Sequence, residues 1–205
     1  MYENYWNLNE KPFENTPDPR FVYLSHEHLE AISRLTYAVE ERKGAALLTG
    51  DYGCGKTVMS RLLFEKLPQD KYEIGMVTNP MLSPIDLLRE ISLQIGIKNS
   101  LGRNKTQLLA SLNERFYENM NSNKDTVIII DEAQTIRNPL AFEELRLLLN
   151  FQLNKRFLLT LILIGQPELR EKIDKMKQLK QRLAVKYHLN PLNLSLIHIS
   201  EPTRQ

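Results

Sequence analysis

Five strand-like stretches, three of them almost wholly apolar, constrain the fold of this chain more than any other feature. Helix-like segments separate them along the chain. Strands that are buried on both faces read as continuous apolar runs, so this alternation predicts an α/β fold with a parallel sheet covered by helices on both sides. The five stretches are AALLT at 45–49, YEIGMVTN at 72–79, TVIIIDEAQ at 126–134, FLLTLILIG at 157–165 and LAVKYHL at 183–189.

The intervening helices are predicted from apolar spacing and from signals at their ends. Ser25 is placed as the N-cap of a helix that Gly44 ends, with Leu29, Ile32, Leu35 and Val39 at helical spacing. A second helix opens with a serine cap at residue 83 and a first-turn proline and closes on a glycine at residue 96. Further helices are expected over 56–67, 105–120 and 138–150.

Composition narrows the class without naming a function. The 205 residues are 42% hydrophobic and 25% charged, as in ordinary globular chains, and the net charge of +2 is too small to indicate nucleic acid or an anionic membrane. The single cysteine, Cys54, cannot form an internal disulfide, which favours a reducing compartment. No secretory signal is visible, and the longest apolar run is far short of the roughly 20 residues of a spanning helix.

The motif GDYGCGKT follows the first apolar run and opens the next helix. It fits the pattern GxxxxGK[ST], in which glycines let backbone N–H groups turn inward toward phosphate oxygens. Its lysine would meet the β and γ phosphates of a nucleotide, and its threonine hydroxyl would meet Mg²⁺. The alternative is a glycine-rich turn with a stray lysine, which the strand before and the helix after disfavour. The predicted nucleotide-binding residues are Gly50, Asp51, Tyr52, Gly53, Cys54, Gly55, Lys56, Thr57 and Val58.

An acidic pair ends the third strand-like stretch. Asp131 is expected to hold Mg²⁺ together with Thr57, and Glu132 is expected to orient the attacking water. Glu132, for its action on the water, and Lys56, for its contact with the phosphates, are therefore candidate catalytic residues. The alternative for the pair is that it only caps the next turn. Gln166 ends the fourth strand and is placed to contact the γ-phosphate or the water, unless it is a simple loop glutamine.

Arg182 completes the predicted catalytic set. It lies just before the fifth strand, where it could reach the nucleotide of a neighbouring subunit, although an arginine on a solvated face is the alternative. Two histidines, His26 and His28, are expected at an exposed helix start without metal-ligand spacing. Backbone amides around Cys54 are expected to favour its thiolate.

A long signature resembles one known family. KPFENTPDPRFVYLSHEHLEAISRLTYAVEERKGAALLTGDYGCGKT, followed by DEAQ, GQPELR and QRLAVKYHLNPL, is similar to the AAA-type ATPases of the general secretion pathway, the protein A (ExeA-like) family. The resemblance runs from about Tyr5 to Leu192. It implies a P-loop AAA+ core with strand order 5-1-4-3-2, and Mg²⁺-dependent ATP hydrolysis between the subunits of a homo-oligomer.

The same resemblance implies a role in assembling a secretion complex with a membrane partner, from the cytoplasm and in association with the inner membrane through regions outside this chain. Two other functions stay open. One is a DNA-transposition helper ATPase, which a basic strip favours, although DNA is the less favoured partner. The other is a nucleotide-dependent scaffold with little turnover. The strip consists of Lys172, Lys175, Lys177, Lys180, Arg182 and Lys186.

Departures from the family pattern are small. Val58 stands where a second threonine is usual, and Cys54 where a small residue such as threonine or serine is usual. Three parts are expected: an extended segment at 1–24, the AAA+ core at 25–193, and a tail at 194–205. The tail, LSLIHISEPTRQ, resembles a translated sequencing adapter more than a natural end, so the helical lid of an AAA+ protein is expected to be missing.

Overall fold

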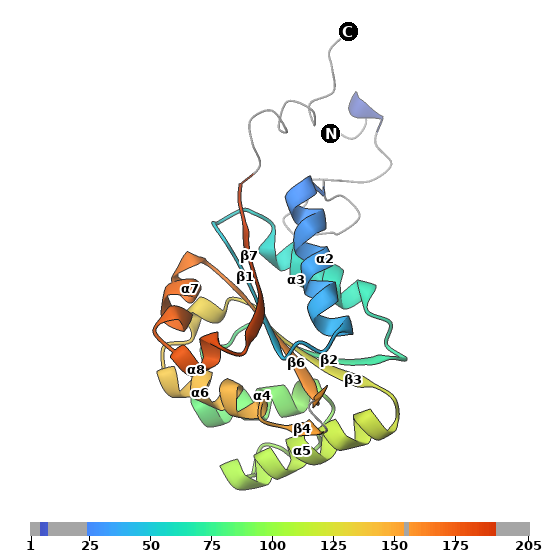
Figure 1. Ribbon diagram of the computed structural model, residues 1–205, viewed down its shortest axis with the longest axis vertical. Coiled ribbons are helices and arrows are strands. Elements are labelled where there is room, and N and C mark those ends of the chain that lie inside the picture. The colour runs from blue at the N-terminus through green and yellow to red at the C-terminus, as the bar shows by residue number, and fades with distance from the viewer. Residues whose placement is uncertain (1–4, 8–23, 154–155, 192–205) are drawn as a thin grey trace.

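The computed structural model describes residues 5–7, 24–153 and 156–191 of the chain (Figure 1). Most of the extended segment expected at 1–24, and the whole of the tail expected at 194–205, lie outside the described residues. The division of the chain into these parts therefore stays a prediction. Nearly all of the described residues belong to the core expected at 25–193.

A five-stranded parallel sheet forms the centre of the molecule (Figure 1). Its strand order is β2-β3-β6-β1-β7. Counted along the chain and read from the β7 edge, these five strands stand in the predicted order 5-1-4-3-2, and the α/β class is confirmed. The strands are β1 (Ala45–Gly50), β2 (Tyr72–Val77), β3 (Asp125–Ile130), β6 (Leu159–Gly165) and β7 (Leu183–Leu189).

One small feature of the strand pattern was not predicted. A two-stranded antiparallel hairpin, β4 (Gln152–Leu153) and β5 (Arg156–Phe157), precedes β6. Phe157 pairs with Gln152 in this hairpin, so the strand expected at 157–165 enters the main sheet only at Leu159.

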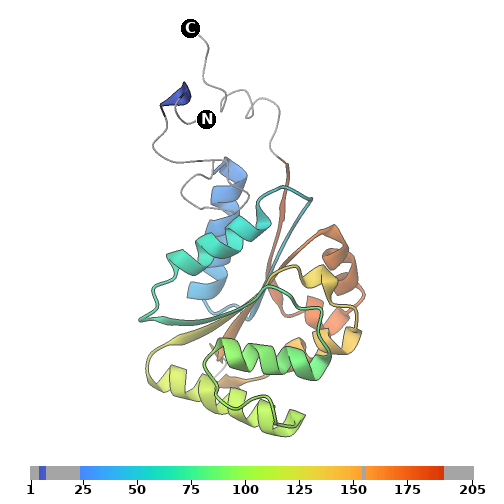
Figure 2. The same cartoon turned by 180° about the vertical axis from the view of Figure 1, so that it is seen from behind.

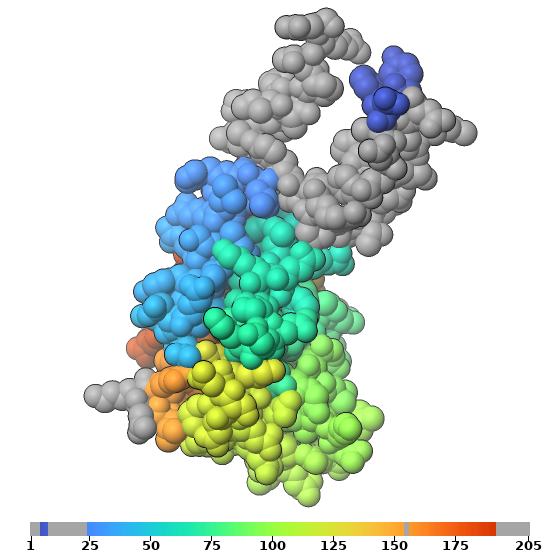
Figure 3. All heavy atoms as spheres, turned by 90° about the vertical axis from the view of Figure 1, so that its right-hand side faces the viewer, coloured from blue at the N-terminus to red at the C-terminus, as the bar shows by residue number. Residues whose placement is uncertain are grey.

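Helices cover both faces of the sheet (Figures 1 and 2). On one face, α2 (His26–Glu40) packs beside α3 (Lys56–Lys66), and Figure 3 shows the two lying side by side. The other face carries α4 (Pro84–Gln94), α5 (Lys105–Asn121), α6 (Pro139–Leu148), α7 (Pro167–Asp174) and α8 (Lys177–Lys180).

Alternate strand residues supply the two cores. In β1, Ala46 and Leu48 are buried with α2 and α3, whereas Ala45 and Leu47 are buried with the helices of the opposite face. Neighbouring residues of a strand point to opposite faces, so a strand packed on both sides must be apolar throughout, as this one is.

Most helix ends agree with the sequence signals. Ser25 accepts a hydrogen bond from the His28 N–H as the N-cap of α2, and Ser83 caps α4 in the same way. The end predicted at Gly44 is wrong, because α2 stops at Glu40. The chain turns there through Arg42 in the left-handed region (φ 49°), whose guanidinium donates to Asp125 on β3 at 2.7 Å.

Parallel strands bring their carboxyl ends to one edge of the sheet. The adjacent strands β3, β6 and β1 therefore place the loops that begin at Asp131, Gln166 and Asp51 next to one another. At this edge Gly50 lies so close to β7 that an added Cβ would be 2.6 Å from the Leu189 carbonyl oxygen. The fold thus gathers most of the predicted site residues in one place.

Candidate active site

The loop between β1 and α3 has the backbone of an anion cradle. Gly53 and Gly55 have φ values of 75° and 83°, which side chains with a Cβ rarely adopt. The 11-residue helix α3 begins directly after Gly55, and no side chain caps its N-terminus. The first N–H groups of a helix need an acceptor from outside the helix, and phosphate oxygens suit that position.

Lys56 is folded into this loop. Its side chain is buried, and its ammonium donates to the backbone carbonyl of Asp51 at 2.7 Å. Tyr52 stands 82% exposed beside it, with its ring centre 6.0 Å from the lysine nitrogen. A buried ammonium held by a single carbonyl within a glycine loop can transfer its hydrogen bonds to an entering phosphate.

Asp131 follows β3 as a nearly inaccessible carboxylate, with 2% of its surface exposed. It accepts a hydrogen bond from the Glu132 N–H at 2.9 Å, and the Ser60 hydroxyl lies 3.2 Å away. Burial raises the pKa of Asp131 above its ordinary value, while hydrogen bonds from the Glu132 N–H, Ser60 and Thr57 oppose the rise. The hydroxyl of Thr57 and this carboxylate are oxygen ligands of the kind Mg²⁺ prefers, so the residues present fit that ion.

Glu132 has a left-handed backbone, with φ 51° and ψ 34°. Such a conformation costs a residue with a Cβ on the order of 1–3 kcal/mol, and strain of this kind concentrates at functional sites. Glu132 precedes the 3₁₀ turn η2 (Ala133–Thr135), but its side chain does not cap that turn. Its carboxylate instead accepts a hydrogen bond from the Gln134 amide at 2.5 Å.

Gln166 lies at the same edge, directly after β6. Its side chain is buried, and its backbone N–H donates to the amide oxygen of Gln134 at 3.0 Å. The structure therefore brings together the loop after β1, the acidic pair after β3 and Gln166.

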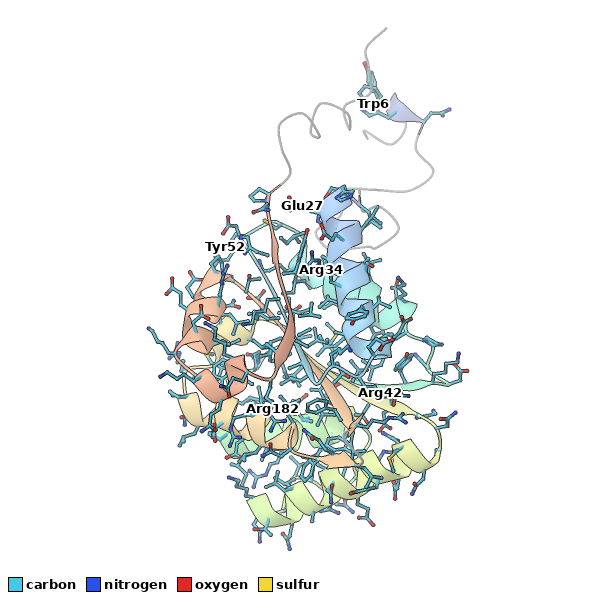
Figure 4. The ribbon with its side chains drawn as sticks, in the orientation of Figure 1. Trp6, Glu27, Arg34, Arg42, Tyr52 and Arg182 are labelled. Carbon is cyan, nitrogen blue, oxygen red and sulfur yellow. The ribbon has the colours of Figure 1, made fainter. Side chains whose placement is uncertain are left out.

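Arg182 is not part of this cluster. It directly precedes β7, at the amino end of the strands, whereas the loop of residues 50–58, called the phosphate loop below, lies at their carboxyl end. Figure 4 shows Arg182 and Tyr52, a residue of that loop, well apart. Its guanidinium donates to Asn150 at 3.1 Å and lies 5.9 Å from the centre of the Phe157 ring. Arg182 therefore lies out of reach of the phosphate loop of its own chain.

The expectation that His28 is exposed is wrong. The imidazole is 5% exposed, with Nδ1 2.6 Å from the Ser25 hydroxyl and Nε2 3.0 Å from the Cys54 carbonyl oxygen. The helical spacing of apolar residues is the signal that indicates this burial, because His28 stands three and four residues before the buried Ala31 and Ile32. Leu29, which the spacing placed on the buried face, is 51% exposed.

The thiol of Cys54 also differs from expectation. The residue is 6% exposed and packs in the core beneath α2 and α3. Burial raises the pKa of the Cys54 thiol, and the nearby Lys56 charge only partly opposes this. The neighbouring Val58 packs against the same core, so the residue that replaces the usual threonine makes an apolar contact.

Two kinds of feature are absent from the described part of the chain. Within it, no group of three or more His, Cys, Asp and Glu side chains is arranged to hold a metal ion. No helix in the same residues is long and apolar enough to cross a membrane.

The comparisons with known proteins agree with this geometry. The family described as "AAA domain" matches residues 39–173, so the chain belongs to the AAA domain family. This confirms the predicted class, a P-loop ATPase domain of the AAA type. The General secretion pathway protein A of Aeromonas hydrophila is 36% identical over 195 residues, which confirms the resemblance found in the sequence. Those residues are 94% of this chain but 35% of that relative.

Solved structures show the same fold at low identity. The ORC2 protein of Aeropyrum pernix superposes with a TM-score of 0.67 at 17% identity, covering 87% of this chain and 50% of that one. A Walker-type ATPase of Pyrococcus abyssi superposes with a TM-score of 0.65 at 16% identity, covering 90% of this chain and 59% of that one. Cdc6p of Pyrobaculum aerophilum superposes with a TM-score of 0.66 at 17% identity, covering 91% of this chain and 50% of that one. At these identities the likeness concerns the fold alone.

Proposed function

We propose that this protein binds Mg·ATP in the loop of residues 50–58 and hydrolyses it. The observation that carries the proposal is the convergence of a buried lysine in an uncapped glycine loop with a buried carboxylate on the next strand but one. Lys56 would exchange the Asp51 carbonyl for the β and γ phosphates. Thr57 and Asp131 would hold Mg²⁺, which when bound neutralises phosphate charge that develops during the reaction.

Glu132 is proposed as the residue that orients and polarises the attacking water. Its carboxylate is half-buried, adjoins the Mg²⁺ ligand in sequence, and is fixed by the Gln134 amide. Gln166 is proposed to contact the γ-phosphate or the water from the neighbouring strand. A positioned base of this kind is worth about 10²–10⁴ in rate.

Arg182 is proposed to act across a subunit interface of a homo-oligomer. Its place at the opposite end of the sheet from its own phosphate loop supports a role on a neighbour's nucleotide. An arginine supplied in this way contributes about 10³–10⁵ to the rate and little to binding in its own subunit.

The biological role we propose is to power or regulate the assembly of a secretion complex from the cytoplasm, with a membrane partner. The support is the 36% identity to the secretion pathway protein over nearly the whole of this chain. The basic strip lends little support to a DNA-handling role, because half of it is engaged within the molecule. Lys172 donates to two backbone carbonyls, Lys180 pairs with Asp174 at 2.7 Å, and Arg182 bonds to Asn150.

A mixing experiment tests this function. Arg182→Ala and Glu132→Gln should each bind Mg·ATP and each show low turnover in the full-length protein. Mixed together, they should regain activity, because one interface of a mixed oligomer then carries both intact groups. Arg34→Ala, which removes an exposed arginine from α2, is the matched control and should behave as the parent does. Normal turnover of the Arg182 variant would contradict the interface role.

The alternatives give different results in the same assay. A DNA-transposition helper should hydrolyse ATP faster when duplex DNA is added, whereas our proposal expects no stimulation. A nucleotide-dependent scaffold should bind Mg·ATP tightly with negligible turnover at every protein concentration. Turnover that rises with protein concentration and is indifferent to DNA would support the proposed ATPase.

A further inference from the structure

The side chain of Gln134 joins two loops of the site. Its amide nitrogen donates to the Glu132 carboxylate at 2.5 Å, and its amide oxygen accepts from the Gln166 N–H at 3.0 Å. A carboxylate can only accept and a backbone N–H can only donate, so a single orientation of the amide satisfies both partners. Gln134 therefore links the loop after β3 to the loop after β6, across 32 residues of sequence.

The fold holds this bridge from two further sides. A Cβ added to Gly165 would lie 2.5 Å from the amide oxygen of Gln134. The lack of a side chain at the end of β6 therefore leaves room for this amide. The ammonium of Lys172, on α7, donates to the backbone carbonyls of Gln134 and Ile136, at 2.5 Å and 2.9 Å. The turn η2 is thereby fastened to the helix that begins after Gln166.

We propose that Gln134 is a positioning residue for hydrolysis: it fixes the Glu132 carboxylate relative to Gln166. The inference rests on the proposed role of Glu132. Without the amide, the carboxylate is free to rotate away from the water that it must orient, while the residues that hold the nucleotide keep their places. Hydrolysis should then suffer and binding should not.

Two substitutions break the bridge in different ways. Gln134→Leu removes both hydrogen bonds at similar volume. Gln134→Glu keeps an acceptor for the Gln166 N–H but sets a second carboxylate against Glu132. Both should lower kcat about tenfold to a hundredfold, the worth of one hydrogen bond to a charged group, and leave the Kd for Mg·ATP within about twofold. Gly165→Ala displaces the amide while Gln134 itself stays, and should give the same pattern.

The matched control is Gln94→Leu. Gln94 also donates its amide to a carboxylate, that of Glu90 at 2.9 Å, but on the exposed surface of α4. The Gln94→Leu substitution should leave kcat unchanged. Thermal melting of every variant separates loss of fold from loss of positioning, and a Gln134 variant that still binds Mg·ATP as the parent does is folded at the site.

A double-mutant cycle decides between positioning and general support. If Gln134 acts through Glu132, Gln134→Leu should cause no further loss of turnover in a Glu132→Gln background. Additive losses, or parent-like kcat in both Gln134 variants, would overturn the inference. If Glu132→Gln itself leaves turnover intact, the proposed function fails instead, so the two failures are distinguishable.

Discussion

The hydroxyl of Ser60 lies 3.2 Å from the carboxylate of Asp131 and 2.8 Å from the Thr57 carbonyl oxygen. Ser60 has one hydroxyl proton to share between these two acceptors. The contact ties α3 to the end of β3, and so holds the phosphate loop and the acidic pair in one register. Because Ser60 and Thr57 both belong to α3 and their hydrogen bonds lower the pKa of Asp131, this pKa depends on α3 as well as on β3.

Asp131→Asn should change how the thermal stability of the nucleotide-free protein depends on pH. Burial raises the folded-state pKa of Asp131 above its ordinary value of 3.8, so the native state holds this proton more tightly than the unfolded chain does. The contribution of the carboxyl group to stability is therefore complete below that value and is lost as pH rises through the folded pKa.

Thermal midpoints of the parent and the Asn variant, measured between about pH 4 and pH 8, check this directly. The parent should lose stability relative to the variant as the pH rises through this window. A difference that stays constant with pH would mean that the Asp131 pKa is not raised.

Replacing His28 with alanine should loosen the phosphate loop. The imidazole contacts both the Ser25 cap and the Cys54 carbonyl, and loss of a buried hydrogen-bond partner costs about 1–3 kcal/mol. We expect a lower melting temperature and several-fold weaker binding of Mg·ATP, measured by calorimetry. His26→Ala, at an exposed position two residues earlier, is the control. Equal effects of the two variants would show that the His28 contacts do not support the loop.

Cys54 should react slowly with iodoacetamide at neutral pH. Burial raises the pKa of its thiol and also restricts access, and only the thiolate attacks the reagent. The rate should stay below that of a small free thiol, rise with increasing pH, and rise sharply when the protein is unfolded. Labelling of the native protein at the rate of a free thiol would contradict the buried position.

The phosphate loop and the strand ends could be predicted because their signals are local. Ser25, Ser83 and the run LAVKYHL each indicate an element within a few residues, and β7 has the predicted bounds. Parallel pairing then places strand ends at a common edge, so Asp131 could be assigned to the site from sequence order alone.

The features that could not be predicted depend on contacts between distant segments. Gln134 meets Gln166 across 32 residues, and His28 meets Cys54 across 26. No local pattern marks either pair. The prediction for the Cys54 thiol is wrong for the same reason, because the sequence predicts α2 as a helix but not that it packs over this loop. The segment after α2 is likewise held by a distant contact, the ion pair between Arg42 and Asp125, which lie 83 residues apart.

Lys56→Ala should remove most of the affinity for Mg·ATP. Each charge-assisted hydrogen bond that the ammonium would make to phosphate contributes about 1.5–3 kcal/mol, so Kd should rise by about tenfold to several hundredfold. Lys66→Ala removes an exposed lysine from the other end of α3 and should bind as the parent does. Calorimetric titration with Mg·ATP measures both, and parent-like affinity of the Lys56 variant would exclude this lysine from the cradle.

The most direct measurement of the central claim is the turnover of Glu132→Gln at saturating Mg·ATP in the full-length protein, with its Kd measured beside it. The substitution keeps the shape of the side chain and removes the carboxylate that would polarise the water. We predict an unchanged Kd and a kcat lower by about 10²–10⁴, with Glu65→Gln, an exposed change on α3, behaving as the parent. Parent-like turnover of the Glu132 variant would contradict the proposed mechanism.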